Sequence, residues 1–457
     1  MDSKRSSFTG KIGFILAAAG SAVGLGNIWR FPYLAAQYGG GIFLLVYFIL
    51  AITFGFTLMC AEISLGRKTG QSAIGAFGAL SKKHSYIGLL AALVPTLILP
   101  YYSVIGGWVT KYLAVFISGK VEAAAVITDD FNYFTNFISQ PIEPIGWFLL
   151  FLGITAFVVM LGVEKGIEKV SKVLMPVLVV LTFGIAVYTL FLPGALDGLR
   201  YYLIPDFSKF SFKTVIAAMG QMFYSMSLAM GIMITYGSYM KKDVSIESSV
   251  KSIELFDTGV AFFAGLMIIP AVFSFNPEHI TKSGPGLMFE VLPQVFNNLG
   301  VAGGTVIGSL FFLLVLLAAL TSSISLMETV VSIFQDKFGW GRKFTSLFVF
   351  IISVALGLPS ALGYGLLANV QIAGMAFLDM FDFISNSILM PIVALLTCYF
   401  IGYAIKPKTL ADEIAGNNKF SRRGMFHIMI KYIAPICIML ILISSILSTL
   451  GIKQFQL

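Results

Sequence analysis

The sequence predicts an all-α integral membrane protein with eleven transmembrane helices, and its composition is the first reason. Charged residues make up 11 % of the 457 residues, hydrophobic residues make up 58 %, and the mean hydropathy is +0.90. An ordinary soluble domain contains about 25 % charged residues, so this chain cannot cover a water-exposed surface with polar groups. The lipid bilayer is therefore its expected solvent.

Eleven apolar windows are each long enough to cross a bilayer as a helix. They cover residues 11–37, 41–66, 87–117, 146–162, 167–192, 213–240, 252–275, 303–335, 344–359, 376–405 and 425–450. Glycine and proline mark the junctions, as in "QYGGG" and "FLPGALDG". We expect residues 1–457 to form a single transmembrane domain.

The distribution of basic residues predicts how this domain is oriented. With the eleven windows as spans, 21 of the 30 Lys and Arg residues fall on one side, six on the other and three within spans. The positive-inside rule then places the N-terminus in the cytoplasm and the C-terminus outside, in a multi-pass protein of the cell membrane. The net charge of +8 follows from this topology, so no nucleic-acid partner is expected.

The first and sixth spans share an unusual feature, which predicts an internal repeat. Both contain small and polar residues at mid-depth, in "SAVGLGN" at 21–27 and "FYSMSLAMG" at 223–231. Each opens a block of five spans, about 11–192 for the first block and 213–405 for the second. Because five is an odd number, the second block enters the membrane from the opposite side. This is the layout of a 5+5 inverted repeat with two interrupted helices, followed here by an extra helix at 425–450.

The interrupted first span contains residues that suit ligand binding. Unwound backbone at membrane depth is tolerated only where protein or a water-filled cavity covers it, and its freed carbonyls can bind a cation. Gly20 and Gly24 also form a GxxxG pattern, which by itself favours helix packing. Asn27 and Arg30 follow directly, and polar groups this costly in lipid favour a functional site.

The eighth span carries a second group of polar residues in "AALTSSISLMET". Ala318, Thr321 and Ser322 are spaced to lie on one helix face. Their hydroxyl and carbonyl oxygens form a surface suited to a small alkali cation. Taken alone, the triplet is better explained by hydroxyls that bond back to their own helix.

These segments together resemble a known family of transporters. "AVGLGNIWRFPY", the interrupted sixth span, "LTSS" and "FLDMFDF" are similar to the neurotransmitter:sodium symporter family of the bacterial amino-acid type, from residue 4 to about 405. The resemblance implies two Na⁺ sites. The first would be formed by Gly20, Val23, Ala318, Thr321 and Ser322. The second would be formed by Ala22, Asn27, Ser225, Asp257 and the carboxylate of the substrate.

The resemblance also implies an amino-acid pocket. The substrate carboxylate would meet the Tyr102 hydroxyl and the backbone around Gly24 and Gly26, and the amine would lie near Ser227. Ala22 and Ser225 would also contact the substrate. The substrate side chain would touch Ile98, Tyr224, Met230, Ser323 and Leu326. Arg30 and Asp382 would form an outer gate. Arg5 and Asp336, with Tyr239 nearby, would form an inner gate.

Two positions in the expected site indicate which substrate and which ions it should bind. Monoamine-transporting members of the family carry an aspartate where this chain has Gly24, so glycine here favours a substrate with its own carboxylate. Asp257 replaces a frequent asparagine and lies inside the seventh span. A fixed carboxylate there could serve in place of the chloride that some members bind, which predicts chloride independence. Alternatively, Asp257 is protonated and only hydrogen-bonded.

The functional prediction is sodium-coupled symport of a hydrophobic, and more narrowly aromatic, L-amino acid into the cell by alternating access. Small Ala229 and flexible Met230 suggest an adaptable pocket, similar to members that transport tyrosine or tryptophan. A proton-coupled carrier of the same architecture and a non-transporting sensor stay open as alternatives. No HExxH motif, paired intramembrane aspartates or Ser–His pairing at depth suggests an enzyme. Membrane lipid is an expected partner, and the oligomeric state is not predicted.

Overall fold

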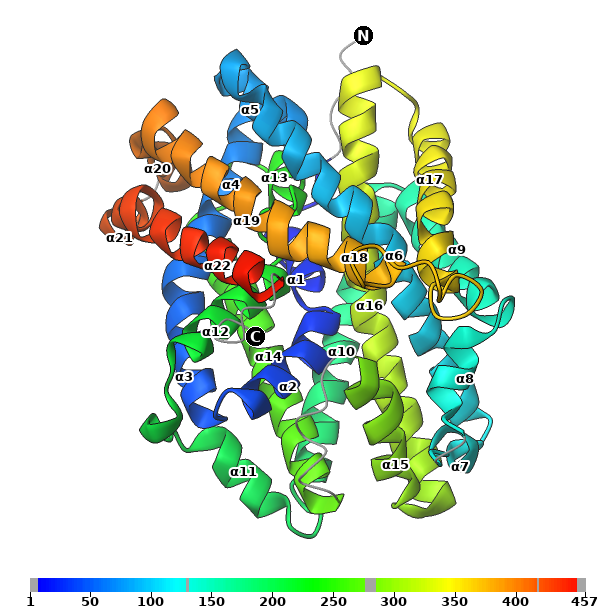
Figure 1. Cartoon of the computed structure of the whole chain (residues 1–457). Helices are drawn as coiled ribbons and strands as arrows, with labels where there is room; N and C mark the ends of the chain where they lie inside the picture. Colours follow the sequence, from blue (N-terminus) through cyan, green and yellow to red (C-terminus); the bar gives the residue numbers. More distant parts are fainter. Residues whose placement is uncertain (1–6, 129–130, 276–284, 417–418, 450–457) are drawn as a thin grey trace.

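The computed structural model describes residues 7–128, 131–275, 285–416 and 419–449. Within these residues the regular structure is helical and contains no β-strand beyond isolated bridges, which confirms the all-α prediction. Figure 1 shows the helices as a bundle, with α5 and α20 near one end and α7, α11 and α15 near the other. We call these the inner and the outer end, because the basic loops predict that the first is cytoplasmic.

The first half of the chain supplies five rods that follow the predicted spans. By a rod we mean one helix, or several consecutive helical segments, that occupies one predicted span. The first is α1 (Lys11–Ala22), η1 (Gly26–Arg30) and α2 (Phe31–Gln37), and the second is α3 (Gly41–Leu50), η2 (Ala51–Gly55) and α4 (Phe56–Thr69). The third to fifth are α6 (Ser85–Ile117), α9 (Glu143–Met160), and η4 (Val163–Glu168) with α10 (Lys169–Thr189). Connections carry α5 (Ala73–Leu80), η3 (Lys82–His84), α7 (Val121–Ala124), α8 (Tyr133–Ser139), α11 (Ala195–Leu203) and η5 (Phe207–Lys209).

The second half of the chain supplies six further rods. Its sixth to eighth rods are α12 (Phe212–Ser225) with α13 (Ile232–Ser238), α14 (Ile246–Phe275) and α16 (Gly300–Phe338). The ninth is α17 (Arg342–Leu362), and the tenth joins α18 (Phe377–Asp382), η8 (Phe383–Leu389), α19 (Met390–Tyr399) and η9 (Phe400–Ala404). The last joins α21 (Arg423–Ile428), η10 (Met429–Ile433) and α22 (Ala434–Thr449). Connections carry η7 (Leu287–Val291), α15 (Leu292–Asn297) and α20 (Pro407–Ala415).

The number of membrane-spanning helices is close to the prediction but does not match it. Among the described residues, nine helices are long and apolar enough to cross a membrane, and the bent pair α1 and η1–α2 makes ten. The sixth predicted span is not counted, because it is divided into the two shorter helices α12 and α13. The count of eleven is therefore not confirmed, although both predicted interruptions are present.

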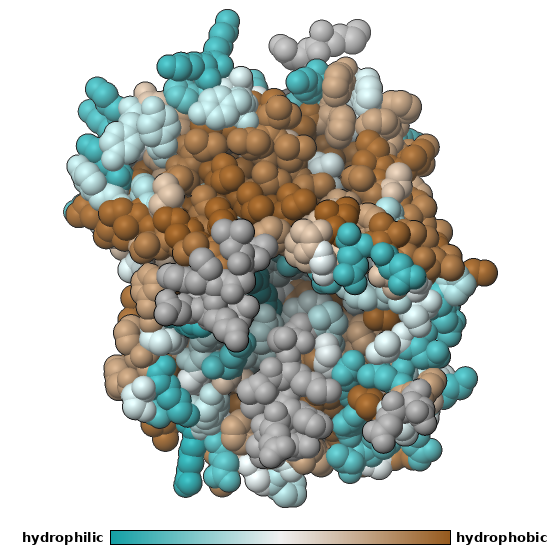
Figure 2. All heavy atoms as spheres, in the orientation of Figure 1, coloured by the Kyte–Doolittle hydropathy of each residue, from teal (hydrophilic) through white to brown (hydrophobic). Residues whose placement is uncertain are grey.

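Burial separates the inner helices from those that face lipid. α16 packs against α6, α9, α10 and α1, and 78 % of its most apolar window is buried. The peripheral helices instead expose large apolar side chains, such as Phe183 on α10, Ile351 on α17 and Ile436 on α22. Figure 2 shows hydrophobic side chains gathered over the surface around α19 and α22, with hydrophilic ones toward the outer end near α11. An apolar exterior around a packed centre is what a bilayer requires.

Candidate functional site

The two helix breaks lie against each other. α1 ends at Ala22, the backbone is extended at Val23, and the two halves of the rod are bent by 53°. In the sixth rod, Ser227, Ala229 and Gly231 have left-handed backbone, with φ of 53°, 59° and 72°. Such conformations are uncommon for residues other than glycine and mark local strain. The Ser227 hydroxyl donates to the carbonyl of Ser21 at 2.9 Å, which links the two breaks.

Two buried polar side chains hold the broken segments in place. Oε1 of Glu62, on α4, accepts a hydrogen bond from the Ala229 backbone N–H at 2.7 Å. Through this contact Glu62 braces the unwound region from a neighbouring helix. Nε2 of Gln221, on α12, donates to the carbonyl of Gly26 at 2.8 Å. Gln221 was not predicted, because one glutamine in an apolar helix has no distinctive pattern.

Oxygen atoms of α16 face the first break, as the predicted cation surface requires. The Ser322 Oγ lies 3.5 Å from the Gly20 carbonyl oxygen and 3.4 Å from that of Val23. Thr321 Oγ1 donates to its own helix, at 3.1 Å from the Ala318 carbonyl oxygen. Thr321 thus bonds back to its own helix, as the alternative interpretation predicted, whereas the Ser322 hydroxyl lies against the first break. Of the residues assigned to the first Na⁺ site, Ser322 therefore approaches Gly20 and Val23, and the Thr321 side chain lies beside Gly20.

The second predicted Na⁺ site is a closed network around Asp257. This carboxylate is fully buried and accepts hydrogen bonds from Asn27 Nδ2 at 2.7 Å and Ser225 Oγ at 2.6 Å. The Tyr47 hydroxyl donates to its other oxygen at 3.2 Å. Asn27 Oδ1 in turn accepts from the Gly24 N–H at 3.0 Å, so one side chain connects the carboxylate to the first break. Tyr47 was missed, because it lies in the uniformly apolar run "LLVYFIL".

A pocket between these two networks contains most of the predicted substrate-binding residues. Its cavity volume is about 30 Å³. Predicted residues that line it are Ala22, Gly24, Gly26, Ile98, Tyr102, Tyr224, Ser225, Ser227, Met230 and Leu326. Ser21, Leu25, Ile232 and Ser322 line it as well and were not predicted as substrate contacts. Ser323 does not line it. Its hydroxyl lies 3.0 Å from that of Thr155, on α9.

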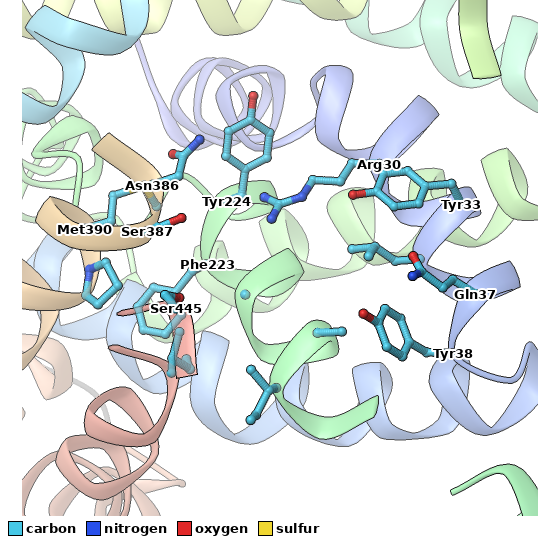
Figure 3. A pocket seen from close by; sticks show the side chains of 16 residues that line it. Arg30, Tyr33, Gln37, Tyr38, Phe223, Tyr224, Asn386, Ser387, Met390 and Ser445 are labelled. Carbon is cyan, nitrogen blue, oxygen red and sulfur yellow. The ribbon is translucent and has the colours of Figure 1, made fainter. Parts of the chain in front are cut away.

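Arg30 and Asp382, the predicted outer gate, share the wall of a wider cavity on the outer side of this pocket. Tyr224 lines both cavities and so lies between them. Arg30 Cζ lies 5.2 Å from the centre of the Tyr224 ring, and Figure 3 shows the guanidinium pointing toward that ring. Asp382 accepts a hydrogen bond from the Tyr101 hydroxyl at 3.0 Å. No ion pair within 4.0 Å joins these two described residues, so the gate stays a prediction.

The inner end of the site is closed by aromatic rings and a buried ion pair. Phe8 packs edge-on against Tyr236 and Tyr239. The Tyr239 hydroxyl donates to Glu328 at 2.8 Å, and Arg342 forms a two-pronged salt bridge with the same carboxylate. Glu328 was not predicted, although an acid inside the apolar eighth span was a signal that could have found it.

The predicted inner gate is only partly within the described structure. Arg5 lies outside the described residues. Asp336 accepts a hydrogen bond from the Ser72 backbone N–H at 2.7 Å, at the start of α5. The Arg5–Asp336 pair therefore stays a prediction.

We expect Arg342→Met to destabilise the protein strongly. The Glu328 side chain is 0 % exposed and that of Arg342 is 19 % exposed, so the substitution leaves a buried carboxylate without its cation. Breaking a buried pair in this way costs roughly 3–5 kcal/mol. Thermal unfolding in detergent should show a clearly lower melting temperature, and adding Glu328→Gln should restore most of it. The neighbouring Lys343→Met, at an exposed position, should have no effect; equal effects of both single variants would contradict the assignment.

Comparisons with known proteins are consistent with this geometry. The family model described as the sodium:neurotransmitter symporter family matches residues 5–128 and 136–456. An uncharacterised sodium-dependent transporter of Bacillus subtilis is 35 % identical, covering 99 % of this chain and all of the relative. The human sodium- and chloride-dependent taurine transporter is 29 % identical over 90 % of this chain and 73 % of its own. The crystal structure of MhsT in complex with L-phenylalanine superposes with a TM-score of 0.87 at 38 % identity, covering 97 % of this chain and all of that one.

Proposed function

The chain belongs to the sodium:neurotransmitter symporter family, and from this premise we propose that it couples sodium entry to uptake of a hydrophobic, aromatic L-amino acid. The observation that carries the proposal is the position of Asn27. Its side chain joins the backbone beside the pocket, at Gly24, to the buried carboxylate of Asp257. A sodium ion held here would lie beside the substrate, so the two would bind together.

The donors around both breaks suit sodium as the coupling ion. They are carbonyl, hydroxyl, amide and carboxylate oxygens, which hard cations prefer. Among the described residues no cluster of three or more His, Cys, Asp or Glu side chains exists, so the soft donor sets typical of zinc or copper are absent there. We assign one ion to the Gly20–Ser322 oxygens and a second to the Asn27–Asp257 network.

The pocket lining supports an amino acid with an apolar side chain. None of its lining residues carries a formal charge, so a zwitterion would be held by freed backbone groups and hydroxyls, among them Tyr102 and Ser227. Ile98, Met230, Ile232 and Leu326 supply apolar walls. MhsT, a protein with a very similar fold, was crystallised with L-phenylalanine. An aromatic substrate for this chain is the narrower part of the proposal.

In this proposal, transport alternates between closure of the outer side and closure of the inner side of the pocket. Tyr224 and Arg30 would close the outer side after sodium and substrate bind. The inner side would then open when the Phe8 packing and the Glu328–Arg342 pair separate. The rods containing the breaks would move against the rest, as in other inverted-repeat transporters.

The decisive experiment is uptake of labelled phenylalanine, tyrosine, tryptophan and leucine into proteoliposomes under an inward sodium gradient. Accumulation that stops when potassium replaces sodium supports symport and ranks the substrates. Uptake driven by a pH gradient without sodium would favour the proton-coupled carrier. Sodium-dependent binding with no uptake would instead indicate a sensor.

Asn27→Ala should weaken sodium and substrate binding together. The Asn27 side chain is fully buried and makes hydrogen bonds to Gly24, beside the pocket, and to the Asp257 carboxylate. Its loss should therefore raise both dissociation constants about 10-fold or more. Calorimetry at several sodium concentrations measures both constants. Asn136→Ala, at an exposed position on α8, is the matched control and should change neither. Loss of only one affinity would argue against direct coupling.

A further inference from the structure

A continuous strip of aromatic and basic side chains runs over the outside of the bundle near its inner end. In order of contact its members are Tyr86, His84, Tyr399, Tyr403, Lys431 and Tyr432. We call it the tyrosine–lysine strip. The rings of Tyr399, Tyr403 and Tyr432 are 49 %, 52 % and 54 % exposed, so the strip faces outward, where lipid surrounds a membrane protein.

Lys431 is held at the centre of the strip by local helix geometry. Its Nζ lies 5.7 Å from the ring centre of Tyr403 and 5.3 Å from that of Tyr432. The Tyr403 hydroxyl donates to the Lys431 carbonyl at 2.9 Å. Lys431 lies in the π-helical segment η10, which packs against the π-helical segment η9. Such segments within α-helices often mark functional sites.

Within the described part of the chain, the charge of Lys431 has no acidic partner. No carboxylate lies within 4.0 Å of its Nζ in residues 7–128, 131–275, 285–416 and 419–449. Other buried or half-buried bases are paired there, for example Lys111 with Glu143 and Arg67 with Glu413. A cation on a membrane helix without an acidic partner indicates an anion from outside the chain.

The depth of Lys431 identifies which anion is in reach. Tyr403 donates to the Lys431 carbonyl and lies one residue before Ala404, where its rod ends at the inner end of the bundle. At this level tyrosine rings sit among lipid headgroups, and a lysine side chain extends toward phosphate oxygens. Exposed Lys406 and Lys408 lie just beyond and add positive charge.

We propose that the tyrosine–lysine strip is a binding site for the headgroup phosphate of an anionic phospholipid in the leaflet at the inner end of the bundle. Lys431 binds the phosphate. The tyrosine rings flank the headgroup, and the acyl chains lie along exposed apolar side chains of α21 and α22, such as Ile428 and Ile436.

Native mass spectrometry of the full chain, released from nanodiscs of phosphatidylethanolamine and phosphatidylglycerol, tests this site. The wild-type protein should retain phosphatidylglycerol, and excess inorganic phosphate should not displace it. Lys431→Gln should lower retention about 5-fold, the factor expected for one lysine at an anionic surface. Lys431→Arg should retain the lipid, as should the control Lys343→Gln.

Two results would overturn the proposal. One is equal retention of phosphatidylglycerol by the wild type and Lys431→Gln. The other is a dimeric mass that Lys431→Gln converts to a monomer without a change in bound lipid, which would make the strip a contact between two copies. Sodium-driven uptake by the same variants tests the proposed transport separately, because the strip shares no residue with the pocket.

Discussion

Gly24→Ala is expected to abolish sodium-driven amino-acid uptake, reducing the initial rate by about 100-fold. A Cβ at this position would lie 2.5 Å from Ser322 Oγ and 3.2 Å from the Tyr102 hydroxyl. The first distance is shorter than real contacts allow, so one of these groups must move. Both hydroxyls belong to the proposed binding site, and a 100-fold loss requires only about 2.7 kcal/mol of lost transition-state stabilisation. Initial uptake rates in proteoliposomes, normalised to the amount of folded protein, measure the effect.

Gly184→Ala provides the matched control for this prediction. A Cβ at Gly184, on α10, would meet no atom within 4 Å, and alanine favours helix. This variant should transport at the wild-type rate. Normal uptake by Gly24→Ala would show that no ligand approaches this backbone, and the assigned pocket would then be wrong.

The fold was predictable where a pattern is local. Apolar runs located the rods, and "SAVGLGN" located the first break, because glycine and asparagine are poor choices for a helix that only crosses lipid. Helix ends were less predictable. α14 begins at Ile246, whereas the apolar window begins at residue 252, since the helix continues through polar residues beyond the apolar core. The π-helical segments were not predicted, because their shifted hydrogen bonds depend on neighbouring rods.

The candidate site shows the same division. Gly24, Asn27 and Ser322 come together as expected. They were predictable because their polarity or small size is unusual within apolar spans. Gln221 and Tyr47 were missed, since each becomes informative only when the fold brings its partner close. Ser323 was assigned to the pocket by resemblance, yet it faces Thr155. Residue type indicates a site, but the direction of a side chain depends on packing.

Asp257→Asn is expected to make transport depend on chloride. In the proposed mechanism the buried Asp257 carboxylate balances the charge of sodium in a region of low dielectric, where an uncompensated ion is costly. Asparagine has nearly the same shape and can still accept from Asn27 and Ser225, but it carries no charge. Uptake in gluconate medium should fall 10-fold or more, and chloride should restore a large part of it.

The chloride response separates the two roles considered for Asp257. If the carboxylate is charged, only an added anion compensates for its loss, so the rescue should follow chloride and not gluconate. If Asp257 is protonated and serves only as a hydrogen-bond partner, asparagine should replace it well and uptake should stay near the wild-type rate without chloride. Asp206→Asn, at an exposed outer position, removes one carboxylate away from the site. Its uptake should be the same in chloride and in gluconate medium. Chloride dependence confined to Asp257→Asn would therefore identify the buried charge itself, rather than the general charge of the protein, as the group that balances sodium.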